Sequence, residues 1–365
     1  MNSRNIIKTI VTDKKCPERC GIHEHFWPHL LENRWADDGY PEDTSYMEYF
    51  NLDIHQLGGW FNTQARVLEE NELVEETEET RTMRNGWGTL LRFWKKKAGT
   101  PEHLGFSLTS EEVWKKEYRE HFLSLNKDRF GDLKSLCEKN KTAAKEDDRF
   151  TVFGNLFIFE IMRASMGDVV MLENILLNKA WIEDFCTVLT DFYITHLEYM
   201  FSEAGVPDGF FLYEDLGYTN APFISPDLHQ EMILPHHKKL VDFIHTYDIP
   251  VIIHTCGNIE PHIPAIIEAG FDCLQPMEAK TGMNVVALGK QYAGKISFMG
   301  NIDIQALETN DRDTIREEVL SKLNGVTRNR IPYVLHSDHS ISPGVSLESY
   351  KYMVELFREN CDYVH

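Results

Sequence analysis

A histidine and a cysteine two residues apart are the side chains of this sequence best suited to bind a metal ion. His254 and Cys256 follow the apolar run 250–253, with Gly257 directly after them. At the end of a strand, side chains two apart point the same way, so one ion can reach both. Zinc accepts mixed nitrogen and sulfur ligands, and a catalytic zinc keeps one position open. The alternative is a buried cysteine beside a hydrogen-bonded histidine.

A second polar segment, 336–339, follows the apolar run 333–335. If this run ends near His254, His339 can supply a third zinc ligand. Asp338 can then orient an imidazole or act as an acid. The alternative is a pair of ordinary surface-loop histidines.

Two adjacent carboxylates, Glu214 and Asp215, end the buried run 209–213. Either can bind metal or protonate a leaving group. Because strand side chains alternate, only one of the two is expected to face the interior. The alternative is a role in capping a helix or a loop.

Four further residues are candidates for substrate contacts. His25 belongs to a segment, 16–25, whose cysteine spacing is too wide for a common zinc knuckle but whose histidines can reach over a substrate. Arg163 can clamp a carboxylate or stack on an aromatic ring. Asn301 and Asp303 follow the apolar run 296–299. Several tryptophans precede residue 90 and suit either a lid over a planar substrate or core packing: Trp27, Trp35, Trp60 and Trp87.

The elements that must position these residues alternate regularly from about residue 150. Strands are predicted over 150–159, 209–213, 250–253, 271–274, 296–299 and 333–335, and helices over 180–204, 226–247, 261–269, 284–292, 311–325 and 346–359. Such alternation indicates a parallel sheet. Polar residues end nearly every strand, which favours a (β/α)8 TIM barrel over an open doubly wound sheet, since all strand ends of a barrel meet at one mouth.

The first 145 residues are interpreted as an N-terminal extension packed on the barrel, and residues 146–365 as its main part, both within one structural domain. Asn85 and Gly86 lie between two strand-like runs and predict a β-hairpin turn. A charged helical stretch is expected over 110–140.

Composition narrows the classes of protein that the chain can belong to. It has 365 residues with a formal net charge of -21, which argues against nucleic-acid binding. We find no run of about 20 apolar residues, and the polar N-terminus lacks a secretory pattern, so a cytoplasmic protein is expected. The seven scattered cysteines indicate free thiols or metal ligands.

In order and spacing, several of these segments resemble the uroporphyrinogen decarboxylase superfamily over nearly the whole chain. The matching segments are 215–217 with 224–226, 254–257, 275–276, 300–303, and 338–339 with 347–348. The superfamily has a (β/α)8 barrel, in agreement with the prediction above. Its metal-free decarboxylases carry an N-terminal arginine motif that this chain lacks, and they lack the His-x-Cys-Gly element found at His254.

The resemblance is to the cobalamin-dependent methyltransferase branch, which uses His-x-Cys and a later cysteine to bind zinc. By its spacing to Glu348, His339 occupies the position of that cysteine. The resemblance implies transfer of a methyl group from a small methoxylated, aromatic substrate to the Co(I) of a separate corrinoid protein. It also implies a homodimer. Porphyrinogen decarboxylation and transfer from methylcobalamin to a thiol are the alternatives.

Overall fold

Eight parallel strands form a (β/α)8 barrel in the computed structural model, which describes residues 1–365 except 28–29, 42, 67–70, 97–98, 147 and 364–365. Their order around the barrel is β1-β12-β11-β10-β9-β8-β7-β2. The strands are β1 (Gly21–Ile22), β2 (Ile54–Gly58), β7 (Phe150–Leu156), β8 (Gly209–Tyr213), β9 (Val251–Thr255), β10 (Cys273–Pro276), β11 (Ser297–Met299) and β12 (Tyr333–Leu335). The predicted barrel is confirmed.

The end strands β1 and β2 meet through Asp53. Its N–H donates to the Ile22 carbonyl at 2.9 Å, and its carboxylate accepts the Ile22 N–H at 2.9 Å. Both strands lie among the first 145 residues, so the N-terminal part of the chain supplies two of the eight barrel strands. Neither strand is predicted from the sequence, because β1 is only two residues long and β2 has the adjacent polar residues His55 and Gln56 at its centre.

The core of the barrel is apolar at one end and polar at the other. Helix α1 (Ser3–Val11) buries Ile6, Ile7, Ile10 and Val11. These side chains pack against inward-facing residues of the strands, namely Ile54, Phe150, Val152, Phe211, Ile252, Cys273, Met299 and Val334. The N-terminal helix therefore closes one end of the barrel, and the polar strand ends occupy the other.

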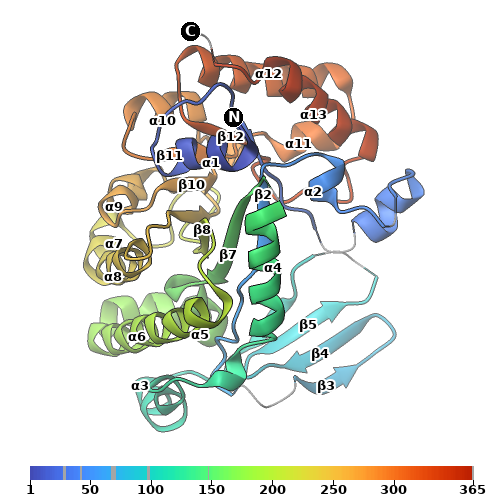
Figure 1. Cartoon of the computed structure of the whole chain (residues 1–365). Coiled ribbons are helices and arrows are strands. Elements are labelled where there is room, and N and C mark those ends of the chain that lie inside the picture. Colours follow the sequence, from blue (N-terminus) through green and yellow to red (C-terminus); the bar gives the residue numbers. More distant parts are fainter. Residues whose placement is uncertain (28–29, 42, 67–70, 97–98, 147, 364–365) are drawn as a thin grey trace.

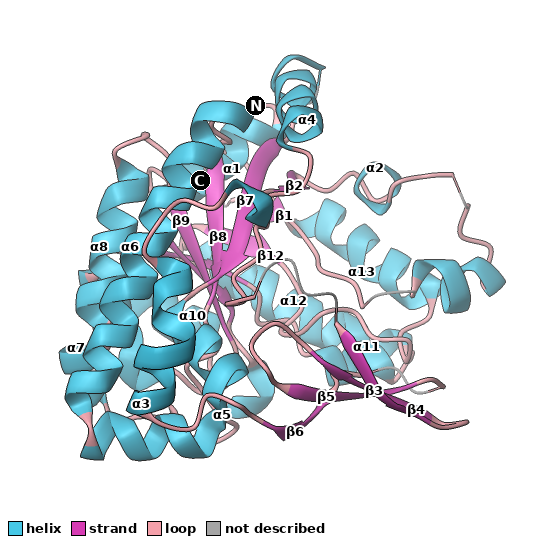
Figure 2. Ribbon diagram, turned by 90° about the horizontal axis from the view of Figure 1, so that it is seen from below, coloured by secondary structure: helices cyan, strands magenta, loops and turns pink. Residues whose placement is uncertain are grey.

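Helices surround the strands (Figures 1 and 2). They are α5 (Ile158–Leu177), α6 (Lys179–Ala204), α7 (Pro226–Met232), α8 (Leu234–His245), α9 (Ile263–Glu268), α10 (Val285–Gln291), α11 (Ile304–Glu308), α12 (Arg312–Arg328) and α13 (Leu347–Asn360). The helix predicted over 226–247 is interrupted at Ile233, where φ is -116°. Pro235 explains the interruption, because proline removes a helical N–H donor.

The charged helical stretch predicted over 110–140 consists of several short helical pieces followed by a longer helix. These are α3 (Glu111–Val113), the π-helix Trp114–Tyr118, the 3-10 helices Arg119–Phe122 and Lys127–Arg129, and α4 (Leu133–Glu146). Smaller elements between β1 and β2 are the π-helix Leu31–Trp35 and α2 (Tyr46–Tyr49).

A separate four-stranded antiparallel sheet projects beside the barrel (Figure 2). Its strands are β3 (Glu72–Glu76), β4 (Thr80–Arg84), β5 (Leu90–Trp94) and β6 (Glu102–Gly105). The predicted hairpin is β4 and β5, with Arg84 opposite Leu90. The turn is longer than predicted: the positive φ of 78° is at Gly88, while the Asn85 side chain accepts the N–H groups of Trp87 and Thr89.

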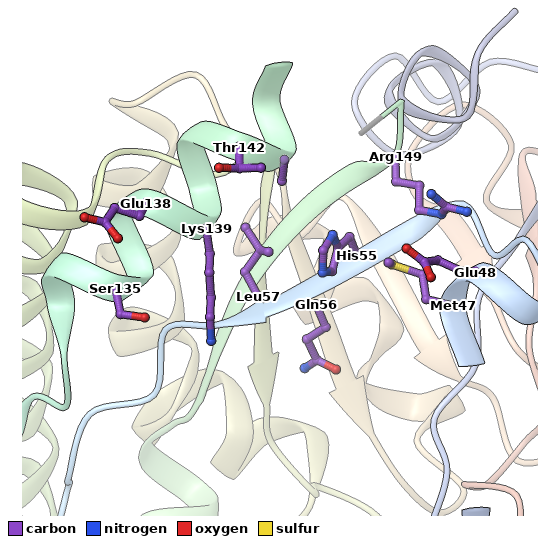
Figure 3. Close-up of a pocket in the computed structure, with 11 residues that line it drawn as sticks. Met47, Glu48, His55, Gln56, Leu57, Ser135, Glu138, Lys139, Thr142 and Arg149 are labelled. Carbon is purple, nitrogen blue, oxygen red and sulfur yellow. The ribbon is translucent and has the colours of Figure 1, made fainter. Parts of the chain in front are cut away.

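The outer face of β2 carries a cavity of about 710 Å³ (Figure 3). Outward-facing His55 and Leu57 of β2 line it together with Lys139 of α4. The neighbouring Gln56 points into the barrel instead, where it reaches Tyr213.

Within the described residues, no helix is long and apolar enough to cross a membrane.

Candidate metal centre

Three side chains converge where β8 and β9 end. The Nε2 atom of His254 lies 3.5 Å from the Cys256 Sγ and 3.6 Å from the Asp215 Oδ1. One donor atom from each residue lies within 4.8 Å of the other two, and this is the one such group of three among the residues that the structure describes. An imidazole, a thiol and a carboxylate so arranged form a ligand set that zinc accepts.

Close contact between two backbones brings Asp215 to Cys256. Gly257 has a φ of 84°, and a Cβ atom there would lie 2.4 Å from the carbonyl carbon of Gly217. A Cβ on Gly217 would lie 2.5 Å from the Cys256 carbonyl oxygen. Both positions thus require glycine, and their contact lets the Cys256 N–H donate to Asp215 at 2.9 Å.

The charge around Cys256 favours a bound cation. Burial, together with the carboxylates of Asp215 and Glu278, raises the pKa of the Cys256 thiol well above its usual value. Forming a thiolate here without a positive charge places it beside two carboxylates in a partly buried site. A divalent cation removes this repulsion, so the donor set fits a metal ion.

The second ring nitrogen of His254, Nδ1, forms a hydrogen bond on the side of the ring away from Cys256 and Asp215. The Gln275 Oε1, on β10, lies 2.6 Å from the His254 Nδ1. This contact leaves the Nε2 atom facing Cys256 and Asp215. Metal-binding histidines commonly have such a partner for the other nitrogen, and it fixes the ring orientation.

A small cavity of about 280 Å³ opens over the three side chains. Its lining contains His254, Cys256 and Asp215 together with His25, Phe26, Trp27, Thr100, Gln275, Pro276, His339 and Ser340. Nearby, the Tyr213 ring lies 5.1 Å from the His254 ring and stacks on Trp60 at 5.2 Å. Aromatic rings therefore flank the candidate metal centre.

His339 lies in this cavity but outside the group of three. Its ring stacks on Trp27, with centroids 5.8 Å apart and planes at 24°. Its Nδ1 lies 3.4 Å from the Ser340 carbonyl oxygen. The prediction that His339 binds metal stays a prediction, and Asp215 is the third donor that the structure places beside His254 and Cys256.

The two other carboxylates predicted to be catalytic are fully buried and cap backbone N–H groups. Glu214 accepts the N–H groups of Phe159 and Glu160 at the start of α5 and lies 2.6 Å from the His237 Nε2. Asp338 accepts the N–H groups of Ala279 and Ile304. These oxygens therefore have a structural role, and the predicted catalytic role of both residues stays a prediction.

The predicted substrate contacts have mixed outcomes. His25 lines the cavity. Asn301 is buried, and its amide bonds to the backbone of Met277, Met283 and Val285. Asp303 caps α11 through the Gln305 N–H. Both have structural roles, because polar residues that follow strands also begin the next helix, and their predicted substrate contacts stay predictions.

Arg163 is held by two carboxylates and an aromatic ring of the protein itself. It donates to Glu160 at 3.0 Å and to Asp168 at 2.9 Å, and its guanidinium lies 4.5 Å from the Phe223 centroid. These contacts lie within the chain, and the predicted substrate contact of Arg163 stays a prediction. Among the tryptophans, Trp35 and Trp87 are buried in the core, whereas Trp27 lines the cavity.

The sequence analysis does not find Gln275, Glu278 or Glu160 as site residues. Burial and the charge of Asp215 raise the pKa of Glu160 to about 7. Gln275 has a signal in the sequence, since it ends a predicted strand beside His254. Glu160 has none, because its helix begins directly after β7 without a turn signal.

Residues 126–360 match the family model described as uroporphyrinogen decarboxylase (URO-D). The chain belongs to the uroporphyrinogen decarboxylase family. Among solved structures it is similar to a methyltransferase from Methanosarcina mazei, with a TM-score of 0.69, 15% identity, and coverage of 98% of this chain and 99% of that chain. At this identity the likeness shows the fold, which the two proteins share along their whole length.

Two other solved structures are less similar. A Xaa-Pro dipeptidase with bound methionine has a TM-score of 0.28 at 12% identity, covering 61% of this chain and 62% of that chain. The catalytic module of a family 98 glycoside hydrolase from Streptococcus pneumoniae has a TM-score of 0.25 at 12% identity, covering 48% and 42%. No curated protein matches the sequence.

Proposed function

We propose that this protein is a zinc-dependent methyltransferase that moves a methyl group from a small methoxylated aromatic compound to the Co(I) of a corrinoid carried by a partner protein. The observation that carries the proposal is the group of Asp215, His254 and Cys256, whose donor atoms lie within 4.8 Å of one another at the barrel mouth. Family membership and the shared fold with a methyltransferase support it.

The proposed ligand set suits an oxygen leaving group. Zinc, when bound, supplies a Lewis acid that stabilises the negative charge developing on the departing oxygen. Asp215 and Cys256 contribute one negative charge each, and the carboxylate is a harder ligand than a second thiolate. The ion is then more electrophilic than one held by two thiolates.

The cavity supports a small, flat methyl donor. Its volume of about 280 Å³ lies just below the usual range for drug-sized ligands, roughly 300–1,000 Å³. Trp27 lines it, and the stacked pair of Tyr213 and Trp60 lies beside His254. These rings can hold an aromatic ring by stacking. A tetrapyrrole is much larger than the cavity.

The experiment that tests the proposal is methyl transfer to a Co(I) corrinoid, followed by its absorbance. The donors are a panel of aryl methyl ethers, methanol, methylamines and methyl thiols. We expect transfer from at least one aryl methyl ether. A zinc-loaded protein that transfers from no donor on the panel contradicts the proposal, as does a zinc-free protein that decarboxylates a porphyrinogen. Methylation of a free thiol by methylcobalamin would instead identify the protein as a methylcobalamin:thiol methyltransferase.

A further inference from the structure

Gln275 connects the candidate metal centre to buried histidines that the proposed reaction does not use. Its side chain is fully buried. The Oε1 atom lies 2.6 Å from the His254 Nδ1, and the Nε2 atom lies 3.3 Å from the His336 Nε2. We propose that Gln275 is a positioning residue that holds His254 in the tautomer protonated on Nδ1, which leaves Nε2 free to bind metal.

The direction of the hydrogen bonds is fixed at the Ser337 carbonyl. This oxygen can only accept, and the His336 Nδ1 lies 2.5 Å from it. His336 must therefore carry a proton on Nδ1. Its environment keeps the ring neutral, because burial lowers the pKa of His336 to about 3. The Nε2 atom of His336 then has a lone pair that accepts. The Glu24 Oε1 also faces it at 3.4 Å, and burial raises the pKa of Glu24 to about 8, so this carboxyl is mostly neutral at pH 7 and does not require a proton on the His336 Nε2.

That lone pair fixes the orientation of the Gln275 amide. An amide oxygen facing the His336 Nε2 would place two acceptors together, so the NH2 group must face His336. The amide oxygen then faces the His254 Nδ1, which must donate to it. The Nε2 atom of His254 is left as a lone pair directed at Cys256 and Asp215.

A second set of hydrogen bonds starts at His336 and runs through His25 to Tyr213, and here too each donor faces an acceptor. The His25 Nδ1 lies 3.0 Å from the His336 Nε2 and must donate to it. The His25 Nε2 therefore accepts from the Tyr213 hydroxyl at 3.3 Å. The Tyr213 oxygen in turn accepts from the Gln56 amide at 2.8 Å. The His336 Nε2 has one lone pair, so the His25 Nδ1–H and the Gln275 NH2 group share it, and the two sets of hydrogen bonds agree on one proton arrangement.

The hydrogen bonds that join His336, Gln275 and His254 matter because a neutral imidazole binds metal only through its unprotonated nitrogen. Partners of this kind behind a metal ligand typically change metal affinity by about 10–100-fold when removed. The functional part of this inference rests on the proposed metal centre. The tautomer itself does not, since it follows from hydrogen bonds within the metal-free chain.

The first test reads the tautomer directly. Long-range 1H–15N correlation spectra of metal-free protein, labelled at histidine nitrogen, distinguish Nδ1–H from Nε2–H rings, and His254→Gln assigns the His254 signal. We expect Nδ1–H for His254 in the wild type and in Gln275→Glu, whose carboxyl still presents an acceptor to His254. Gln275→Met keeps the size but removes the amide, and we expect a mixture of tautomers.

The second test measures zinc affinity by competition with a chromophoric chelator. We expect Gln275→Met to bind zinc about 10–100-fold more weakly than the wild type and Gln275→Glu to recover most of the affinity. An Nε2–H tautomer in the wild type, or unchanged tautomer and affinity in Gln275→Met, would overturn the inference. An Nδ1–H tautomer in a wild type that binds no zinc supports the positioning role and overturns the proposed function.

Discussion

At the scale of single residues, two of the three donors of the metal centre are set by local sequence spacing, and the third is set by contacts between segments far apart in the chain. His254 and Cys256 could be predicted because they lie two apart at a strand end, where the backbone alone sets their direction. The choice between Glu214 and Asp215 could not, because the chain leaves β8 at that point and strand alternation ends. Asp215 turns toward Cys256, while Glu214 turns toward the start of α5.

Zinc affinity is expected to depend on pH through Cys256. Since burial and neighbouring carboxylates raise the pKa of this thiol, it is protonated in the metal-free protein at neutral pH. Zinc must displace that proton, so affinity should rise about tenfold per pH unit between roughly pH 6 and 8. Chelator competition at several pH values measures the slope. An affinity that does not change over this range contradicts a thiolate ligand.

At the scale of elements, the site depends on how neighbouring strand ends contact one another. The loops after β8 and β9 meet at Gly217 and Gly257, and the loop after β12 is tied to its neighbours by Asp338. Sequence reasoning placed polar residues at these strand ends correctly. It could not separate ligands from capping residues, because both are polar and both follow strands.

Gly257→Ala should disrupt the metal centre. The added Cβ would lie 2.4 Å from Gly217 and would occupy a φ of 84°, so the loop carrying Cys256 must move. Gly294→Ala is the matched control, because its φ is 72° but nothing lies within 4 Å of the added atom. We expect Gly257→Ala to lose zinc and Gly294→Ala to keep it at a cost of about 1 kcal/mol in stability. Equal zinc content in both variants contradicts this account.

Asp338→Ala should lower stability rather than abolish zinc binding. The substitution leaves the N–H groups of Ala279 and Ile304 without their acceptor, and each unsatisfied buried group costs about 1–3 kcal/mol. Urea unfolding measures the loss, and zinc content measured on the folded fraction should match the wild type. Wild-type stability combined with lost methyl transfer would instead return Asp338 to a catalytic role.

At the scale of the whole molecule, the barrel was predictable from its second half. Six of the strands, β7 to β12, are apolar runs separated by periodic helices, and the sequence analysis found each of them. The strands β1 and β2 were missed because long-range contacts, such as that between Asp53 and Ile22, define them. The antiparallel sheet was predicted only in part, as one hairpin with a shorter turn.

The most direct test of the central claim is the zinc content of protein purified without chelator. About one zinc per chain is expected in the wild type. We expect the loss of that zinc in each of His254→Ala, Cys256→Ala and Asp215→Asn, whose side chains form the group of three donors, while the zinc content of His339→Ala decides whether His339 is a further ligand. A wild type without zinc, or variants of His254 and Cys256 that retain it, would contradict the account.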